Sequence, residues 1–216
     1  MNSEVDKTNR IFELLKEAKE IAILPSQVSS IDAFSAAVGM YHALKEEGKN
    51  VCIIYPGSIP EEFGSVEGID IKPGSSQREL VVSVDYSNTN ASKVSYSTED
   101  DILRFSISPI DKDFDLSRVR AEIKGLNFDL IITIGAQSRE DLGKSLEEIG
   151  GVFGGADVLN IDNSERNQRF GSINVVEPEF ESISLLVMNM LIRWGLTVSS
   201  KTAEALLKGI SKRKGI

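Results

Sequence analysis

The sequence predicts an α/β fold with a mostly parallel sheet flanked by helices, and three observations support this. Two short apolar runs, residues 21–24 and 51–55, alternate with segments whose apolar side chains recur at helical spacing. The run 128–134, FDLIITI, is continuously apolar, which is typical of a strand buried on both faces. A chain of 216 residues is long enough to bury a large core. We therefore expect a single domain that covers residues 1–216.

The first part of the chain has a helix–strand–helix–strand order. Residues 7–20 carry apolar side chains on one helix face, and the strand 21–24 follows at once. The next helix covers about 31–47, and Gly48 ends it as expected for a glycine just past a helix. The strand 51–55 comes next, so helix 31–47 is the crossover between two parallel strands.

A β-rich insertion is expected at approximately 75–110. The run 80–84 is rich in β-branched side chains, which favour strands. Segments 93–97 and 102–108 alternate apolar and polar residues on either side of a polar turn, which is the pattern of a β-hairpin. We interpret this part as an elaboration inserted into the α/β scaffold.

The scaffold resumes at the strand 128–134. We expect Ser138 to cap a helix that ends near residue 149, and the glycine-rich run 150–155 to form a flexible connection to the next strand. The remaining predicted elements are two strands and two helices, at 158–161, 173–176, 180–194 and 199–212.

Charge and composition exclude several classes of protein. The net charge is −9, from 33 acidic and 24 basic residues, whereas proteins that bind long nucleic acids display a basic face. No apolar run approaches the ~20 residues of a membrane span, and the charged N-terminal segment is unlike a signal peptide. The single cysteine, Cys52, excludes a disulfide framework. We expect a cytoplasmic protein without a membrane partner and without strong binding to long nucleic acids.

The single histidine, His42, limits the chemistry that the sequence can support. A catalytic triad needs a general base, and a soft-metal site needs several histidine or cysteine ligands. His42 falls within helix 31–47, where a surface or core-edge position is expected, and Cys52 falls in a buried strand. Glycine-rich phosphate loops and nucleophile elbows are absent from the sequence. We therefore assign no catalytic residue.

Carboxylates at the predicted strand ends are the remaining candidates. Asp85 and Asp162 each follow a predicted strand, Asp32 lies in the first turn of helix 31–47, and Glu177 lies further on. Mg²⁺ or Mn²⁺ would need several such groups to converge. The alternative is that each carboxylate serves as a turn or cap residue; Ser29 and Asp32, for example, have the spacing of a capping box.

A second candidate is an anion site at the start of helix 31–47. Backbone N–H groups at a helix N-terminus favour negative ligands. Ser29 and Ser30 lie at this start, and Arg166 and Arg169 are the basic residues we associate with it.

Three segments resemble the DHH phosphoesterase superfamily, closest to its oligoribonuclease (nanoRNase) and 3′-phosphoadenosine-5′-phosphate phosphatase branch. The best stretch, 160–179, reads NIDNSERNQRFGSINVVEPE and resembles the family pattern N-I-D-H-H-P-S-N-x-x-F-G-x-I-N-x-V-D-P. The helix from Asp32 to Leu44 and the segment 203–210, AEALLKGI, resemble two further family segments. The resemblance implies a Rossmann-like DHH domain. Relatives continue into a smaller substrate-binding domain, which we expect to be absent from this chain.

The metal-binding motifs of the family are degenerate in this sequence. The family uses histidines and aspartates that hold two metal ions, and the resemblance leaves only Asp32 and Asp162, as vestigial ligands. The replaced ligand positions are Ser26, Ser30, Gly135, Asn163, Ser164 and Arg213.

The resemblance therefore implies an inactive phosphoesterase-like domain that serves as a binding or interaction module. Its partner would be an unidentified protein or a small nucleotide, a homo-oligomer is possible, and no cofactor is expected. The alternative is a residual manganese- or magnesium-dependent phosphoesterase that uses Asp32, Asp85 and Asp162. Its substrates would be short oligoribonucleotides or 3′-phosphoadenosine-5′-phosphate.

Overall fold

The chain consists of two compact units. Unit 1 comprises Met1–Gln77 and Leu126–Ile216, and unit 2 comprises Arg78–Gly125. Each unit is described by itself. The computed structural model describes residues 2–28, 31–64, 69–72, 79–88, 92–110, 112–124 and 127–213.

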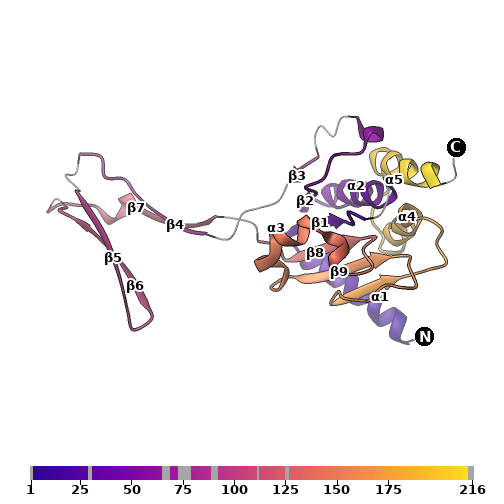
Figure 1. Cartoon of the computed structure of the whole chain (residues 1–216), viewed down its shortest axis with the longest axis horizontal. Coiled ribbons are helices and arrows are strands. Elements are labelled where there is room, and N and C mark those ends of the chain that lie inside the picture. Colours follow the sequence, from indigo (N-terminus) through magenta and orange to yellow (C-terminus); the bar gives the residue numbers. More distant parts are fainter. Residues whose placement is uncertain are drawn as a thin grey trace. The chain divides into compact units, whose positions relative to one another are not determined.

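Unit 1 contains a six-stranded sheet in the order β10-β9-β8-β1-β2-β3, and its strand pairs are parallel (Figure 1). This confirms the predicted α/β fold. The strands are β1 (Glu20–Pro25), β2 (Asn50–Ile54), β3 (Ile71–Lys72), β8 (Leu130–Ile134), β9 (Asp157–Asp162) and β10 (Ile173–Val176).

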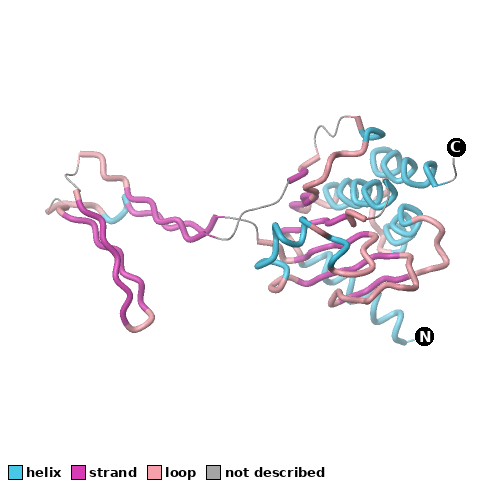
Figure 2. The backbone as a smooth tube through the Cα atoms, viewed as in Figure 1, coloured by secondary structure: helices cyan, strands magenta, loops and turns pink. Residues whose placement is uncertain are grey.

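Helices flank this sheet, as Figure 2 shows in cyan against the magenta strands. Two separate apolar clusters line the two faces of the sheet. One cluster includes side chains of α1, α2, α4 and α5, and the other includes side chains of α3. The helices are α1 (Asn2–Glu17), α2 (Ile31–Glu46), α3 (Lys144–Phe153), α4 (Ile183–Arg193) and α5 (Ser200–Arg213). No helix among the described residues is long and apolar enough to span a membrane.

The alternation of side chains along β1 explains why this strand is apolar throughout. Ile21 and Ile23 belong to the cluster on the α2 side, and Ala22 and Leu24 belong to the cluster on the α3 side. All four side chains are buried. Such a strand must lie inside the sheet, and β1 indeed pairs with β2 and β8.

Unit 2 contains two antiparallel two-stranded sheets. Strand β4 (Glu79–Val84) pairs with β7 (Val119–Lys124), and β5 (Lys93–Glu99) pairs with β6 (Ile102–Ser108). Strand β7 lies beyond the approximate end of the predicted insertion at 110 and pairs with β4, so the β-rich part extends to Lys124.

The predicted start of the helix after β8 is also wrong. Ser138 precedes a short 3₁₀ turn, Glu140–Leu142, and α3 begins only at Lys144. The carboxylate of Asp141 accepts hydrogen bonds from the backbone N–H groups of Gln137 (2.8 Å) and Ser138 (3.3 Å), so the chain turns before the helix. Residues 150–153 of the glycine-rich run continue α3 instead of forming a connection.

Candidate functional site

The order of the strands places a switch point between β1 and β8. The chain builds β2 and β3 on one side of β1, and after unit 2 it builds β8, β9 and β10 on the other side. In open α/β sheets, ligands bind outside the carboxyl ends of the strands at such a point. The candidate site is therefore the loop region that follows β1, β8 and β9.

Three of the positions singled out in the sequence lie in a row along this edge. The N–H of Ser26 donates to the carbonyl of Ile134 (2.8 Å), and the N–H of Gly135 donates to the carbonyl of Ile161 (2.8 Å). Asp162 is the next residue after Ile161 and ends β9. Ser26 and Gly135 are thus the first residues after β1 and β8, and Asp162 is the last residue of β9.

The backbone at Gly135 is unlike that of an ordinary strand end. Its φ is 73°, in the left-handed region that side-chain-bearing residues rarely adopt. An aspartate here would cost about 1 kcal/mol of strain before it could bind anything. The sheet edge is therefore shaped for glycine at this position.

Asp162 is held by hydrogen bonds at the edge of the sheet. Its Oδ1 accepts from the N–H of Asn163 (2.9 Å), and its Oδ2 accepts from Nδ2 of Asn167 (2.8 Å). Burial raises the pKa of this carboxyl above its ordinary value, and the negative charge of Asp141 acts in the same direction; the hydrogen bonds oppose this shift. Asp141 is thus close enough to Asp162 for its charge to act on this carboxyl.

A network of asparagines surrounds Asp162. Nδ2 of Asn167 also donates to the carbonyl of Ala136 (2.8 Å), so the loop after β9 is tied to the loop after β8. Asn160, fully buried in β9, accepts from Thr133 Oγ1 (2.9 Å) and donates to Asn167 Oδ1 (3.0 Å). This network satisfies buried polar groups and fixes the loops, which is a structural function.

Asp32 lies under α5 and not in an open cleft. The side chain is 3 % exposed. Its Oδ2 accepts from the N–H of Ile183 (2.8 Å), and its Oδ1 accepts from the N–H of Ser184 (2.9 Å) and from Ser182 Oγ (3.0 Å). These donors form the N-terminus of α4, where a carboxylate is favoured by the free N–H groups and by the helix dipole. Asp32 therefore caps a helix about 150 residues further along the chain.

Helix α5 closes over this carboxylate through Gly209. A Cβ built on Gly209 would lie 2.7 Å from Asp32 Oδ1 and 2.9 Å from Ser35 Cβ, and it would overlap Ser184 Oγ. Only a glycine leaves room here for the hydrogen bonds between α2 and α4. The proposed capping box between Ser29 and Asp32 falls partly outside the described residues, since Ser29 is not among them.

The other candidate carboxylates are engaged elsewhere. Asp85 belongs to unit 2, where its Oδ1 accepts from Ser87 Oγ (2.6 Å) and lies 3.5 Å from Arg118. These hydrogen bonds from Ser87 hold the pKa of Asp85 below its usual value. Glu177 forms an ion pair with Arg193 (2.9 Å) on α4.

The remaining candidate positions surround the loop after β9 or lie outside the described part. Arg166 and Arg169 are exposed in that loop, and the N–H of Arg166 donates to Ser164 Oγ (3.2 Å). Asn163 Nδ2 donates to the carbonyl of Phe180 (2.7 Å). Ser29, Ser30 and the side chain of Arg213 lie outside the described residues.

The described residues do not fit a two-metal centre. They contain no group of three or more histidine, cysteine, aspartate or glutamate side chains that could hold a metal ion. Two hard divalent cations need several carboxylate or imidazole ligands, whereas Asp32 is occupied by the N-terminus of α4 and Ser26 and Gly135 offer no anionic ligand. No step of metal chemistry is therefore derived for this edge.

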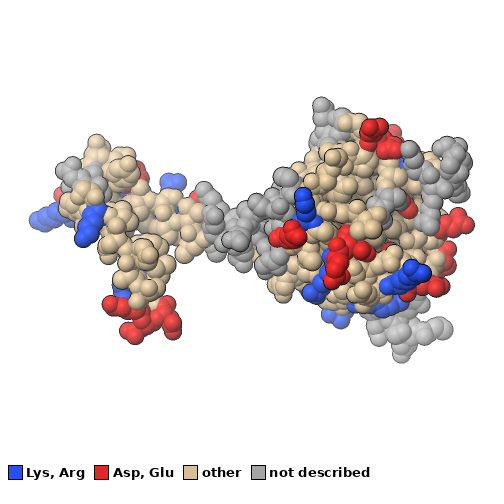
Figure 3. All heavy atoms as spheres, in the orientation of Figure 1, with Lys and Arg blue, Asp and Glu red and all other residues tan. Residues whose placement is uncertain are grey.

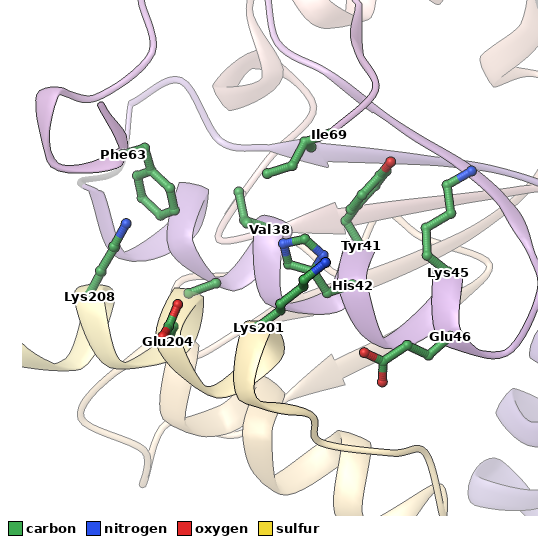
Figure 4. A pocket seen from close by; sticks show the side chains of 11 residues that line it. Val38, Tyr41, His42, Lys45, Glu46, Phe63, Ile69, Lys201, Glu204 and Lys208 are labelled. Carbon is green, nitrogen blue, oxygen red and sulfur yellow. The ribbon is translucent and has the colours of Figure 1, made fainter. Parts of the chain in front are cut away.

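A separate hollow of about 630 Å³ lies between α2 and α5 (Figure 4). Its charged lining includes Lys45, Lys201 and Lys208, opposed by Glu46 and Glu204. His42 is half-buried there, as expected for a histidine at the edge of the core. Burial and the nearby Lys201 charge lower the pKa of this imidazole, which favours its neutral form at pH 7.

The sequence did not single out Asp141, Asn160, Asn167 or Gln27. Gln27 lies directly after β1 and donates through Nε2 to Ser145 Oγ (2.9 Å), so it ties the β1 loop to α3. Asn160 carried a visible signal, because it is a polar residue inside an otherwise apolar strand. The hydrogen-bond partner of Gln27, Ser145, lies 118 residues away. The partners of Asp141 are backbone N–H groups that only the turn brings to it. No spacing rule predicts either interaction.

Fold and site together define an α/β protein with a parallel sheet and a polar, largely neutral edge at its switch point. No family model matches the sequence. The chain is similar to the solved structure of an exopolyphosphatase-related protein from Bacteroides fragilis, with a TM-score of 0.65 and 16 % identity. The match covers 97 % of this chain and 50 % of that one, so the chain spans about half the length of that protein. At this identity the similarity establishes the fold.

Proposed function

We propose that this chain is a phosphoesterase-like domain of the DHH type that has lost catalysis and acts as a binding or interaction module. One observation carries the proposal: the carboxylate of Asp32 is buried and accepts three hydrogen bonds at the N-terminus of α4. In the family that the sequence resembles, this position is a metal ligand. A carboxylate that stabilises a helix end is not available to bind a cation.

The rest of the edge supports the same proposal. Ser26 and Gly135 lie where the resemblance requires a histidine and an aspartate, and neither can supply a hard anionic ligand. Asp162 is hydrogen-bonded to Asn163 and Asn167. The fold shared with an exopolyphosphatase-related protein is consistent with descent from a phosphoesterase, with only the scaffold retained.

The alternative is a residual phosphoesterase, and one observation favours it. Asp141 and Asp162 are both carboxylates at the switch point, close enough for the charge of one to raise the pKa of the other. Two acids of this kind are the minimum for a single weakly held Mn²⁺ or Mg²⁺.

A hydrolysis assay separates the two proposals. The full chain is incubated with Mn²⁺ and, in turn, a short oligoribonucleotide, 3′-phosphoadenosine-5′-phosphate and a chromogenic phosphodiester. We expect turnover no faster than in the protein-free blank. Metal-dependent turnover that is lost in Asp162→Asn but kept in Glu46→Gln, an exposed control, would overturn the inactive-domain proposal.

A further inference from the structure

The β5–β6 hairpin of unit 2 has one apolar face. The strand register places Val94 opposite Ile107 and Tyr96 opposite Phe105, and directly opposite residues of an antiparallel pair share a face. Leu103, two residues from Phe105, lies on the same face. This face therefore presents an aromatic pair flanked by aliphatic side chains.

The opposite face of the hairpin is polar. Ser95 lies opposite Ser106 and Ser97 lies opposite Arg104, whose guanidinium is 3.5 Å from the carboxylate of Glu99. In Figure 3 the charged side chains of unit 2 gather in small groups, separated by stretches without charge. The hairpin is thus amphipathic: one face is polar and suited to solvent, and the other face is apolar.

The β4–β7 ribbon repeats this pattern. Val82 lies opposite Ala121 and Val84 opposite Val119, and Leu80 extends the same face. Ser83 and Arg120 form a pair on the other face. Period-2 alternation in both ribbons indicates that each evolved to place one side against another apolar layer.

The described residues of unit 2 leave both apolar faces exposed. Tyr96 is 75 % exposed, Phe105 59 % and Leu80 69 %. Of the sixteen exposed large hydrophobic side chains among the described residues, eleven belong to unit 2. A two-stranded ribbon alone is marginally stable in water, and an exposed apolar face marks an interaction site.

The properties of the faces indicate what covers them. They carry no charge, so the partner surface must be apolar. In the described part of unit 1, five large hydrophobic side chains are exposed, each on a separate element or loop, against eleven in the described part of unit 2. A second copy of the chain presents the same apolar, uncharged faces, and a two-fold axis brings identical surfaces together.

The exposed area reaches the size of a standard interface when both faces are covered. If a large side chain presents roughly 200 Å² when fully exposed, the exposed fractions of seven large hydrophobic side chains on the two faces add up to roughly 800 Å² per copy. A standard protein interface buries about 800 Å² on each partner. These seven side chains are Leu80, Val82, Val94, Tyr96, Leu103, Phe105 and Val119.

We propose that unit 2 is a homodimerisation module, in which the apolar faces of β5–β6 and β4–β7 pack against those of a second copy. Tyr96 and Phe105 form the central contact, since buried aromatic side chains dominate interface energetics. This proposal names the partner of the interaction role suggested above. It rests on that role only in part, and its test involves no catalysis, so either proposal can fail without the other.

Sedimentation velocity of the full chain, from about 1 to about 100 µM, tests the proposal. We expect a concentration-dependent dimer. The variant Phe105→Lys places a charge on the apolar face and should weaken the dimer at least about 30-fold. Ser106→Lys, the next residue on the opposite face, should change the dissociation constant by less than about threefold.

A chain that remains monomeric over this range would overturn the proposal, as would equal effects of the two lysine variants. Hydrogen exchange of the backbone amides needs no substitution, so it tests the proposal even where a lysine variant disturbs the hairpin. In the wild-type chain the amides of β5 and β6 should gain protection as the protein concentration rises. Protection that is independent of concentration would contradict dimerisation through this face.

Discussion

At the scale of single residues, Asp32 shows how one acidic side chain can hold a fold together. The carboxylate accepts hydrogen bonds from two backbone N–H groups and a hydroxyl at the start of α4. These donors are buried and would otherwise be without partners, because the first N–H groups of a helix have no intrahelical acceptor. Asp32 also joins two segments that are distant in sequence, which makes it a tertiary clamp as well as a cap.

The substitution Asp32→Ala should lower the free energy of unfolding by about 3 kcal/mol or more, since each buried donor left unsatisfied costs about 1–3 kcal/mol. Urea denaturation monitored by circular dichroism measures this loss. Glu46→Ala, on the exposed end of the same helix, should stay within about 0.5 kcal/mol of the wild type. An Asp32→Ala protein as stable as the Glu46→Ala control would show that the clamp contributes nothing.

At the scale of elements, the close approach of α2 and α5 decides how the helical layer is assembled. Gly39 on α2 faces the side chain of Leu206, and Gly209 on α5 faces Asp32 and Ser184. Each glycine accepts a neighbour where a methyl group would collide. The two glycines therefore set the distance between the helices and keep the Asp32 hydrogen bonds enclosed.

The substitution Gly209→Ala should destabilise unit 1 by about 2 kcal/mol or more, although alanine favours helix, because the added methyl group overpacks a filled site. Gly154→Ala is the matched control, since a Cβ at Gly154 would meet no atom within 4 Å. Thermal or urea unfolding of both variants measures the difference. Equal stability of the two variants would mean that α5 can shift away from Asp32 without cost.

At the scale of the whole molecule, the sequence predicted the sheet better than the site. β1 and β8 are mostly apolar because both of their faces are buried, and that signal is local. Strand β7 (VRAEIK) alternates apolar and charged residues as β5 and β6 do, so the signal for this strand was present in the sequence and was overlooked. The start of α3 was missed because hydrogen bonds to the Asp141 carboxylate turn the chain before the helix begins. The end of α3 was missed because Gly150 and Gly151 remain helical.

The role of Asp32 could not be predicted from spacing. Its partners Ser182, Ile183 and Ser184 lie about 150 residues away, and only the packing of α4 against α2 brings them together. Local patterns indicated a cap at the start of its own helix. The structure instead places its carboxylate at the start of a different helix.

The central proposal is that the switch-point edge of this sheet holds no metal centre. Isothermal titration calorimetry of the full chain with Mn²⁺ tests it most directly, because binding is measured without a substrate. We predict no saturable binding with a dissociation constant below about 1 mM. Saturable binding of one or two ions per chain, lost in both Asp32→Asn and Asp162→Asn, would contradict the account.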